Sequence, residues 1–255
     1  MELSPCVEWI YAEELPEMAD RIRAAKDAGF GQVEFHLWRD KDVDSIAKAL
    51  DETGIKLTGL VVEPRRSLVD PAQHAEFLDA VRDSIVTAKK LGSPPLVIAS
   101  GFTREGVSHE EHVAAAVSAL KQAAALAEEA GIMLVLEPLN DRVEHPGMFL
   151  VSTKLGLDIV EAVGSPNLRL LYDAYHSSVM YENLEEVLAG RTHLVAHVQV
   201  ADKPGRNEPG TGSIDWKSTL STLEKLGYRG SLGLEYRPTL PAKESLAKTR
   251  AALGV

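Results

Sequence analysis

The sequence predicts an α/β fold and, within that class, a single (β/α)8 barrel. Short apolar strands alternate with amphipathic helices along the whole of the 255 residues, a length typical of such a barrel. The expected strands are continuous apolar runs such as MLVLE and SLGLE, which suits parallel strands covered on both faces. No glycine-rich phosphate loop follows the first expected strand, so the alternative of an open doubly wound sheet is less favoured.

The elements follow one another in a regular order. Apolar runs bounded by turn residues predict strands at residues 6–9, 32–35, 56–61, 95–99, 133–137, 168–173, 194–201 and 231–235. Apolar residues that recur with a helical period predict helices at residues 15–28, 43–53, 74–91, 110–130, 153–163, 184–188 and 216–226. Five of these helices are followed by a glycine suited to a left-handed cap: Gly29, Gly54, Gly92, Gly131 and Gly227.

Composition indicates one globular domain spanning residues 1–255. Apolar residues make up 45% and charged residues 25% of the chain, and no low-complexity linker interrupts it. The net charge of −11 would repel a phosphate backbone, so we expect no nucleic-acid partner. A homodimer is compatible with a barrel of this type, although no surface stripe in the sequence specifies one.

The sequence also favours a cytoplasmic location. No run of 18 apolar residues is present, and the start of the chain lacks the basic segment of a signal peptide, so we expect no membrane association. The single cysteine, Cys6, excludes a disulfide framework and a cysteine-based zinc site, and it fits a reducing compartment. We expect Cys6 to be a small buried apolar residue.

Polar residues lie at the carboxyl ends of four of the last five expected strands. Glu137, Asp173 and Glu235 end three of them, and His197 and Gln199 share one face of the strand between the last two. A lone carboxylate at a strand end is more often a helix cap or solvated. Three carboxylates that converge on the active face of a barrel, however, cannot all stay ionised without a cation. An oxygen-rich set of this kind suits Mg²⁺, Mn²⁺ or Co²⁺.

Basic residues follow the same strands and suggest a small anionic substrate. His176 lies three residues beyond Asp173, and Lys203 and Arg206 lie in the glycine- and proline-containing loop after the seventh strand. Arginine is the residue suited to bidentate recognition of a carboxylate. Arg142 and Arg237 also follow active-face strands, although a single arginine is more often a solvated ion-pair partner.

Residues of the N-terminal half also qualify as pocket residues. Glu34 and His36 end the second strand, and Trp9 and Trp38 could form a wall, although aromatic residues are more often core. Gly233 precedes Glu235 on the same strand face and leaves room beside it.

Four segments carry a family likeness: EPLNDR with PGMFL, YDAYH, AHVQVADKPGRNEPGTGSIDW and GYRGSLGLEYRP. They cover residues 137–238, and on them the chain resembles the xylose isomerase-like TIM-barrel superfamily of sugar isomerases and epimerases. Within it, the chain looks most like the hydroxypyruvate isomerase family. Gln199 is typical of that branch, since related ketose 3-epimerases usually have histidine there. The segment LVVEPRRSLVDPAQH after the third strand is shorter than the pocket-shaping loop expected in this family.

The resemblance implies a set of site residues. It assigns one divalent ion, Mg²⁺ or Mn²⁺ with Co²⁺ as an alternative, to Glu137, Asp173, Gln199 and Glu235. Glu137 and Glu235 would also donate and accept the transferred proton. Contacts to a small anionic or sugar-like substrate would come from His176, Arg206, His197 and Lys203.

The resemblance also implies a reaction. A metal-dependent isomerase would interconvert hydroxypyruvate and 2-hydroxy-3-oxopropanoate (tartronate semialdehyde) through a cis-enediolate, with Arg206 paired to the substrate carboxylate. A ketose 3-epimerase, a 2-oxotetronate isomerase, or a dehydratase acting on inosose or dehydroshikimate would use the same barrel. A DNA-repair endonuclease of this fold is disfavoured, because it needs a histidine-rich cluster of several metals and a basic groove. A non-catalytic sugar-binding barrel is the alternative from another class.

Overall fold

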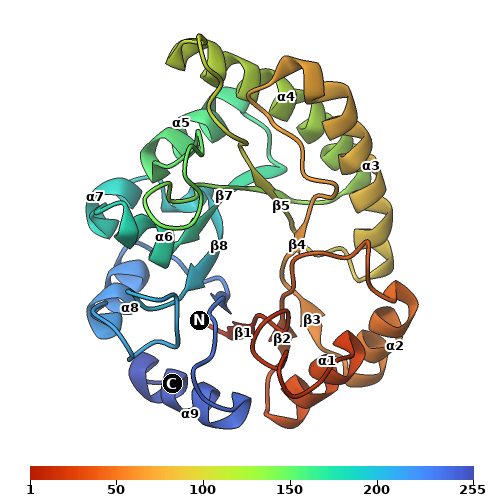
Figure 1. Cartoon of the computed structure of the whole chain (residues 1–255), viewed down its shortest axis with the longest axis vertical. Coiled ribbons are helices and arrows are strands. Elements are labelled where there is room, and N and C mark those ends of the chain that lie inside the picture. Colours follow the sequence, from red (N-terminus) through yellow and green to blue (C-terminus); the bar gives the residue numbers. More distant parts are fainter.

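The computed structural model describes all of residues 1–255, and its strands curl into a barrel with helices around the outside (Figure 1). The strands are β1 Leu3–Pro5, β2 Gln32–Val33, β3 Lys56–Leu57, β4 Leu60–Val61, β5 Leu96–Ala99, β6 Leu134–Glu137, β7 Leu168–Asp173, β8 Val195–Val200 and β9 Leu232–Leu234. The α-helices are α1 Met18–Asp27, α2 Val43–Thr53, α3 His74–Lys90, α4 His109–Ala130, α5 Thr153–Val163, α6 Ala174–Val179, α7 Leu184–Leu188, α8 Trp216–Lys225 and α9 Ala242–Leu253. The 3₁₀ turns η1 Pro71–Gln73 and η2 Thr192–Leu194 complete the chain.

The strands confirm the predicted (β/α)8 barrel. Seven of them form one parallel sheet in the order β1-β9-β8-β7-β6-β5-β4, and β2 pairs with β3. A parallel bridge between Cys6 and Glu34 joins β1 to β2, and the Val61 amide donates to the His36 carbonyl at 2.9 Å. Since β3 and β4 are two parts of the predicted strand at 56–61, eight chain segments surround the barrel axis.

The first strand lies earlier than the sequence suggested. We expected a strand at residues 6–9, but β1 ends at Pro5, and the amides of Trp9 and Ile10 both donate back to the Cys6 carbonyl. Cys6 and Val7 of this run are buried at the start of a turn, and a short apolar run cannot distinguish a turn from a strand. The sequence analysis also missed α6 and α9. The helices at 43–53, 153–163 and 184–188 coincide with the prediction, and all five cap glycines have positive φ.

A small apolar cluster inside the barrel forms the floor of the active face. It consists of Val61, Val97, Val135 and Leu171, one from each of four consecutive strands, whereas a larger cluster of 63 buried residues fills the space between strands and helices. Val135 and Leu171 lie two residues before Glu137 and Asp173, and residues two apart share a strand face. The strand-end carboxylates therefore lie directly above this floor, as predicted.

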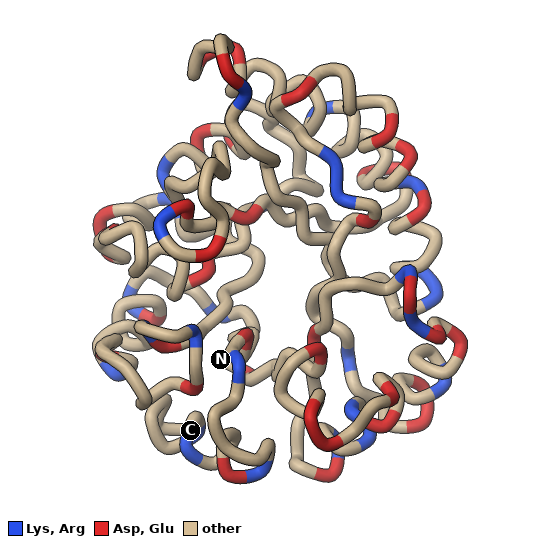
Figure 2. The backbone as a smooth tube through the Cα atoms, in the orientation of Figure 1, with Lys and Arg blue, Asp and Glu red and all other residues tan.

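Charged residues of both signs are spread over the outer helices (Figure 2). No helix of the chain is long and apolar enough to cross a membrane. Cys6, the single cysteine of the chain, is fully buried and has a free thiol, as expected.

Candidate active site

A cavity of about 970 Å³ opens at the carboxyl ends of the strands. Its inner part is lined by residues that the sequence singled out: Glu137, His176, Gln199, Arg206 and Glu235. Its outer part is lined by the segments that follow β4 and β5. These predicted site residues therefore come together from β6, helix α6, β8, the loop after β8 and the residue that follows β9.

Asp173 serves both as a helix cap and as a site residue. Its Oδ1 accepts the backbone N–H groups of Tyr175 and His176 at 2.7 and 3.2 Å, and so caps α6. Its Oδ2 is left to face the site, where Arg206 Nη2 donates to it at 3.0 Å. Asp173 is thus a helix cap whose second oxygen is oriented toward Arg206, and its predicted role as a metal ligand stays a prediction.

The Arg206 guanidinium lies at the centre of the inner cavity. Nη2 also donates to Glu235 Oε2 at 2.8 Å, and Nη1 donates to Glu144 Oε2 at 2.8 Å. The guanidinium carbon lies 5.1 Å from the Trp9 ring centroid and 5.2 Å from that of Tyr175. Both terminal nitrogens are therefore engaged with protein carboxylates, and the expected pairing of Arg206 with a substrate carboxylate stays a prediction.

The carboxylates differ strongly in pKa. Burial, together with the charges of Glu235 and Asp173, raises the pKa of Glu137 well above its usual value. Burial also raises the pKa of Asp173 to about 7, although Arg206 opposes this shift. For Glu235, burial is outweighed by Arg206 and His36, and the pKa is lowered to about 2. One guanidinium is therefore not enough to keep all three carboxylates ionised at neutral pH.

A buried network fixes the orientation of Gln199. The Gln199 side-chain amide donates to Glu34 Oε1 at 2.9 Å, and Glu34 Oε2 lies 2.6 Å from His197 Nε2. All three side chains are almost completely buried. Gly233 provides the space for the Glu34 carboxylate, because a Cβ at this position would lie 2.5 Å from Glu34 Oε2. With its nitrogen held, Gln199 has a fixed orientation in which Oε1 has no protein partner.

His176 is held as a hydrogen-bond donor. Its Nδ1 accepts hydrogen bonds from the backbone and side-chain N–H groups of Asn140 at 3.0 and 2.7 Å. Burial and the charge of Arg206 lower the pKa of His176 well below its usual value, so the ring is neutral and its proton is on Nε2. Nε2 lies 3.6 Å from Asp173 and 4.0 Å from Glu137, too far for a hydrogen bond.

Unsatisfied buried polar atoms concentrate in this cavity. Only four buried side-chain nitrogen or oxygen atoms of the protein lack a hydrogen-bond partner, and three of them are Gln199 Oε1, His176 Nε2 and Arg206 Nε. Buried polar groups are nearly always paired, because an unpaired group loses the free energy of its hydration. One acceptor and two donors left unpaired together indicate a site built for a ligand.

The family model described as "Xylose isomerase-like TIM barrel" matches residues 22–252. The chain belongs to the xylose isomerase-like TIM-barrel family. It is 35% identical to a putative hydroxypyruvate isomerase of Streptomyces coelicolor, over 88% of this chain and 87% of the relative. It is 31% identical to a 2-oxo-tetronate isomerase of Haemophilus influenzae, over 86% and 87%. The crystal structure of an AP endonuclease, family 2, from Brucella melitensis covers 96% of both chains with a TM-score of 0.89 and 30% identity.

These comparisons confirm the predicted family and enzyme class: this xylose isomerase-like barrel is an isomerase. They carry no residue assignments, so the roles of the site residues depend on geometry. One candidate metal group in the barrel brings ligand atoms of Glu137, Asp173 and His176 within 4.8 Å of one another. A second such group consists of Glu144, His145 and His176.

The inner site of this barrel fits a divalent cation. Glu137, Asp173 and Glu235 offer carboxylate oxygens, and the unpaired Gln199 Oε1 adds a neutral oxygen fixed by Glu34. Hard cations prefer such oxygen donors, and their charge would allow all three carboxylates to ionise. His176 is not part of this donor set, since Nε2 carries a proton and Nδ1 is occupied by Asn140.

Of the other predicted residues, some line the cavity, some contact Gln199 from its buried side, and some lie outside the cavity. Trp9, His36 and Arg237 line the cavity, and His36 Nε2 lies 2.8 Å from Glu235 Oε1. Glu34 and His197 lie behind Gln199, as described above. Three residues do not line the cavity: Lys203 bonds to the Ser178 carbonyl, Arg142 stacks on Tyr181, and Trp38 donates to the Val61 carbonyl.

Sequence reasoning missed Glu144, Tyr175 and Asn140. Asn140 and Tyr175 lie within the family-like segments and Glu144 lies between two of them, one to seven residues from a predicted site residue, so proximity in the chain was the available signal. What it could not show is that Glu144 reaches Arg206, which is 62 residues away in the chain.

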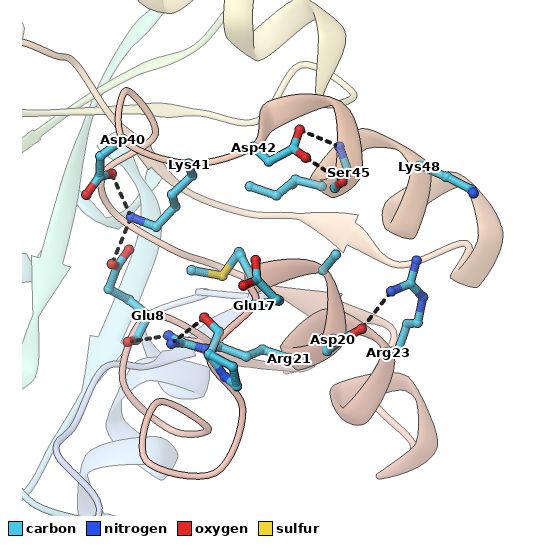
Figure 3. Close-up of a pocket in the computed structure, with 14 residues that line it drawn as sticks. Glu8, Glu17, Asp20, Arg21, Arg23, Asp40, Lys41, Asp42, Ser45 and Lys48 are labelled. Carbon is cyan, nitrogen blue, oxygen red and sulfur yellow. Dashed lines mark hydrogen bonds and ion pairs between the residues drawn. The ribbon is translucent and has the colours of Figure 1, made fainter.

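A second hollow of about 520 Å³ lies between α1 and α2 (Figure 3). Three of its charged groups are paired within the protein: Arg21 donates to carbonyls of Leu15, Val7, Glu8 and Pro16, and Lys41 pairs with Glu8. Glu8 Oε2 also accepts the backbone N–H of His36 at 3.1 Å. This hollow therefore supports the position of His36 and leaves no unpaired buried group of its own.

Proposed function

We propose that the protein interconverts hydroxypyruvate and 2-hydroxy-3-oxopropanoate (tartronate semialdehyde) through a cis-enediolate. The observation that carries the proposal is the group of three unpaired buried atoms, Gln199 Oε1, His176 Nε2 and Arg206 Nε, in a cavity that also contains Glu137 and Glu235. A divalent ion would satisfy the Gln199 acceptor, and a small molecule with adjacent carbonyl and hydroxyl oxygens would satisfy the two donors. The relatives named as isomerases of hydroxypyruvate and of 2-oxo-tetronate support this class of substrate.

Glu137, Asp173, Gln199 and Glu235 would hold one divalent ion, Mg²⁺ or Mn²⁺ with Co²⁺ as an alternative. When bound, the ion supplies a Lewis acid that stabilises the negative charge developing on the substrate oxygens. We propose no nucleic-acid partner, because the net charge is −11.

The two glutamates supply the proton transfer. One removes a proton from C3 of hydroxypyruvate, which leaves the enediolate, and a proton is then delivered to C2. The hydroxyl proton moves from the C3 oxygen to the C2 oxygen in the same step sequence, so that atoms and electrons balance without a co-reactant. The His36 imidazole, 2.8 Å from Glu235 Oε1, and the Arg206 guanidinium hold Glu235 in place during this transfer.

His176 and Arg206 orient the reacting oxygens. His176 can donate through Nε2 to a substrate oxygen, since Asn140 fixes its tautomer. Arg206 can donate through Nε while its terminal nitrogens stay bound to Asp173, Glu235 and Glu144. Both donors would be placed before substrate arrives, which is the condition for electrostatic stabilisation of an enediolate.

A four-carbon 2-oxo acid is the second candidate substrate. The cavity volume of about 970 Å³ lies at the upper end of the range of about 300–1,000 Å³ found for small-molecule sites, so a longer carbon chain has room. A 2-oxotetronate isomerase would use the same residues and the same proton transfer. A ketose 3-epimerase would also use them, on a neutral substrate.

Proton NMR in D₂O tests the proposal. Metal-free protein is expected to leave hydroxypyruvate unchanged, and restoring Mg²⁺ or Mn²⁺ is expected to produce tartronate semialdehyde with deuterium incorporated at C2. Conversion of 2-oxotetronate or of a ketose but not of hydroxypyruvate would transfer the assignment to the second candidate or to an epimerase. Equal turnover with and without metal would contradict the metal-dependent route.

A further inference from the structure

The outer part of the cavity is rich in arginine. Arg65 and Arg66 belong to the segment between β4 and α3, and Arg104 belongs to the segment between β5 and α4. All three line the same cavity as the proposed metal ligands. This is an unusual concentration of positive charge for a chain whose net charge is −11.

Only one of these arginines is without a counter-ion. Arg66 forms an ion pair with Glu76, and Arg104 Nε lies 3.6 Å from Asp70 Oδ1. Arg65 is exposed, and its side chain takes part in no ion pair or hydrogen bond, since only its carbonyl accepts one. The Arg65 guanidinium is therefore a free cation at the wall of the cavity.

The charge of Arg65 acts on His145, another residue that lines the cavity. His145 lines the cavity, and its ring centroid lies 5.6 Å from that of His176. The pKa of His145 is lowered first by burial, and the charges of Arg206 and Arg65 add to this effect. Arg65 thus lines the same cavity as His145, whose ring lies beside that of His176.

The other basic residues of the cavity are already engaged. Arg206 gives its terminal nitrogens to Asp173, Glu235 and Glu144. Arg237 stacks on Trp9 at 5.5 Å and lies 3.9 Å from Glu144. An acidic substrate that reaches the inner site consequently meets one uncompensated guanidinium on its way, that of Arg65.

We propose that Arg65 binds the carboxylate of a 2-oxo acid substrate and so selects acidic substrates over neutral sugars. This inference rests on the proposed isomerase function and adds to it a specificity-determining residue. Guanidinium and carboxylate groups match in a bidentate geometry, and the short segment after β4 places this guanidinium at the edge of the cavity.

The test compares substrates with and without a carboxylate. In the Mg²⁺-loaded enzyme, Arg65→Gln is expected to raise KM for hydroxypyruvate about tenfold, with kcat changed less than about threefold, because a charge-assisted hydrogen bond is lost in binding. Deuterium exchange into dihydroxyacetone, the neutral analogue with the same reacting pair, should be unchanged. Arg65→Lys should lie between the wild type and Arg65→Gln. Arg142→Gln, an exposed arginine outside the cavity, is the matched control.

A binding measurement separates this inference from the proposed function. Isothermal titration of the Mg²⁺-loaded protein with tartronate, which does not isomerise, should give about tenfold weaker affinity for Arg65→Gln than for the wild type and Arg142→Gln. Weaker tartronate binding in a protein that converts no 2-oxo acid would overturn the proposed function and keep the carboxylate site. Turnover of hydroxypyruvate with KM and tartronate affinity unchanged in Arg65→Gln would keep the function and overturn the site. If Arg237→Gln raised KM for hydroxypyruvate and Arg65→Gln did not, the substrate carboxylate would be assigned to Arg237, and the proposed role of Arg65 would be overturned.

Discussion

Replacing Glu235 by glutamine is expected to lower kcat for hydroxypyruvate by roughly 10²–10⁴-fold, the usual contribution of a positioned proton-transfer group. The change is isosteric, but it removes the negative charge and replaces by an amide nitrogen one of the two oxygens that Arg206 and His36 contact at 2.8 Å. It also replaces a charged metal ligand by a neutral amide, so affinity for Mn²⁺ should fall together with turnover. Deuterium exchange at saturating metal measures the loss of proton transfer separately from the loss of metal.

Glu185→Gln is the matched control for this variant, because Glu185 is a half-exposed glutamate on α7 that pairs with Lys225 at the surface. It should retain full turnover and full metal affinity. If Glu235→Gln exchanged deuterium at near the wild-type rate with metal saturating, Glu235 would have no part in proton transfer. Circular dichroism of both variants would verify that neither change alters the fold.

Much of the inner site was predictable from strand periodicity. A strand places residues two apart on one face, so the apolar Val135 and Leu171 fixed the direction of Glu137 and Asp173. The parallel order of the strands then brought their carboxyl ends to one side of the barrel. These inferences needed only local pattern and fold class, and for that reason they hold.

Partners distant in the chain were not predictable in the same way. Glu34 was recognised as a pocket candidate, but its contacts to His197 and Gln199 cross 163 and 165 residues. Arg206 was expected to pair with a substrate carboxylate, but its own segment did not show that it also contacts three carboxylates of the protein. The pattern of one segment does not specify which charges other segments bring to it. In the same way, the sequence does not show that Arg65 is the one cavity arginine whose guanidinium lacks a carboxylate partner.

The position of the Glu34 side chain also gives Gly233 a structural role different from the one that the sequence suggested. The sequence suggested that Gly233 leaves room beside Glu235, whereas the structure fills that room with the Glu34 carboxylate, which would lie 2.5 and 2.6 Å from a Cβ at Gly233. Both Glu34 oxygens are held by His197 and Gln199 and cannot move without breaking a buried hydrogen bond. An added methyl group at this position therefore acts on the orientation of Gln199.

Gly233→Ala is accordingly expected to lower the free energy of unfolding by about 1–3 kcal/mol, the range for overpacking a buried position. It should also weaken Mn²⁺ binding about 10–100-fold, the usual effect of disturbing a group that orients a metal ligand. Gly59→Ala is the control, because Gly59 faces the same Glu34 side chain but its Cβ would lie 3.6 Å from Glu34 Cβ, an ordinary contact. Urea unfolding and titration calorimetry with Mn²⁺ measure both quantities. Equal stability and equal Mn²⁺ affinity in the two variants would show that Glu34 does not orient Gln199 for the metal, whereas a loss confined to Gly233→Ala would connect the buried network directly to the site.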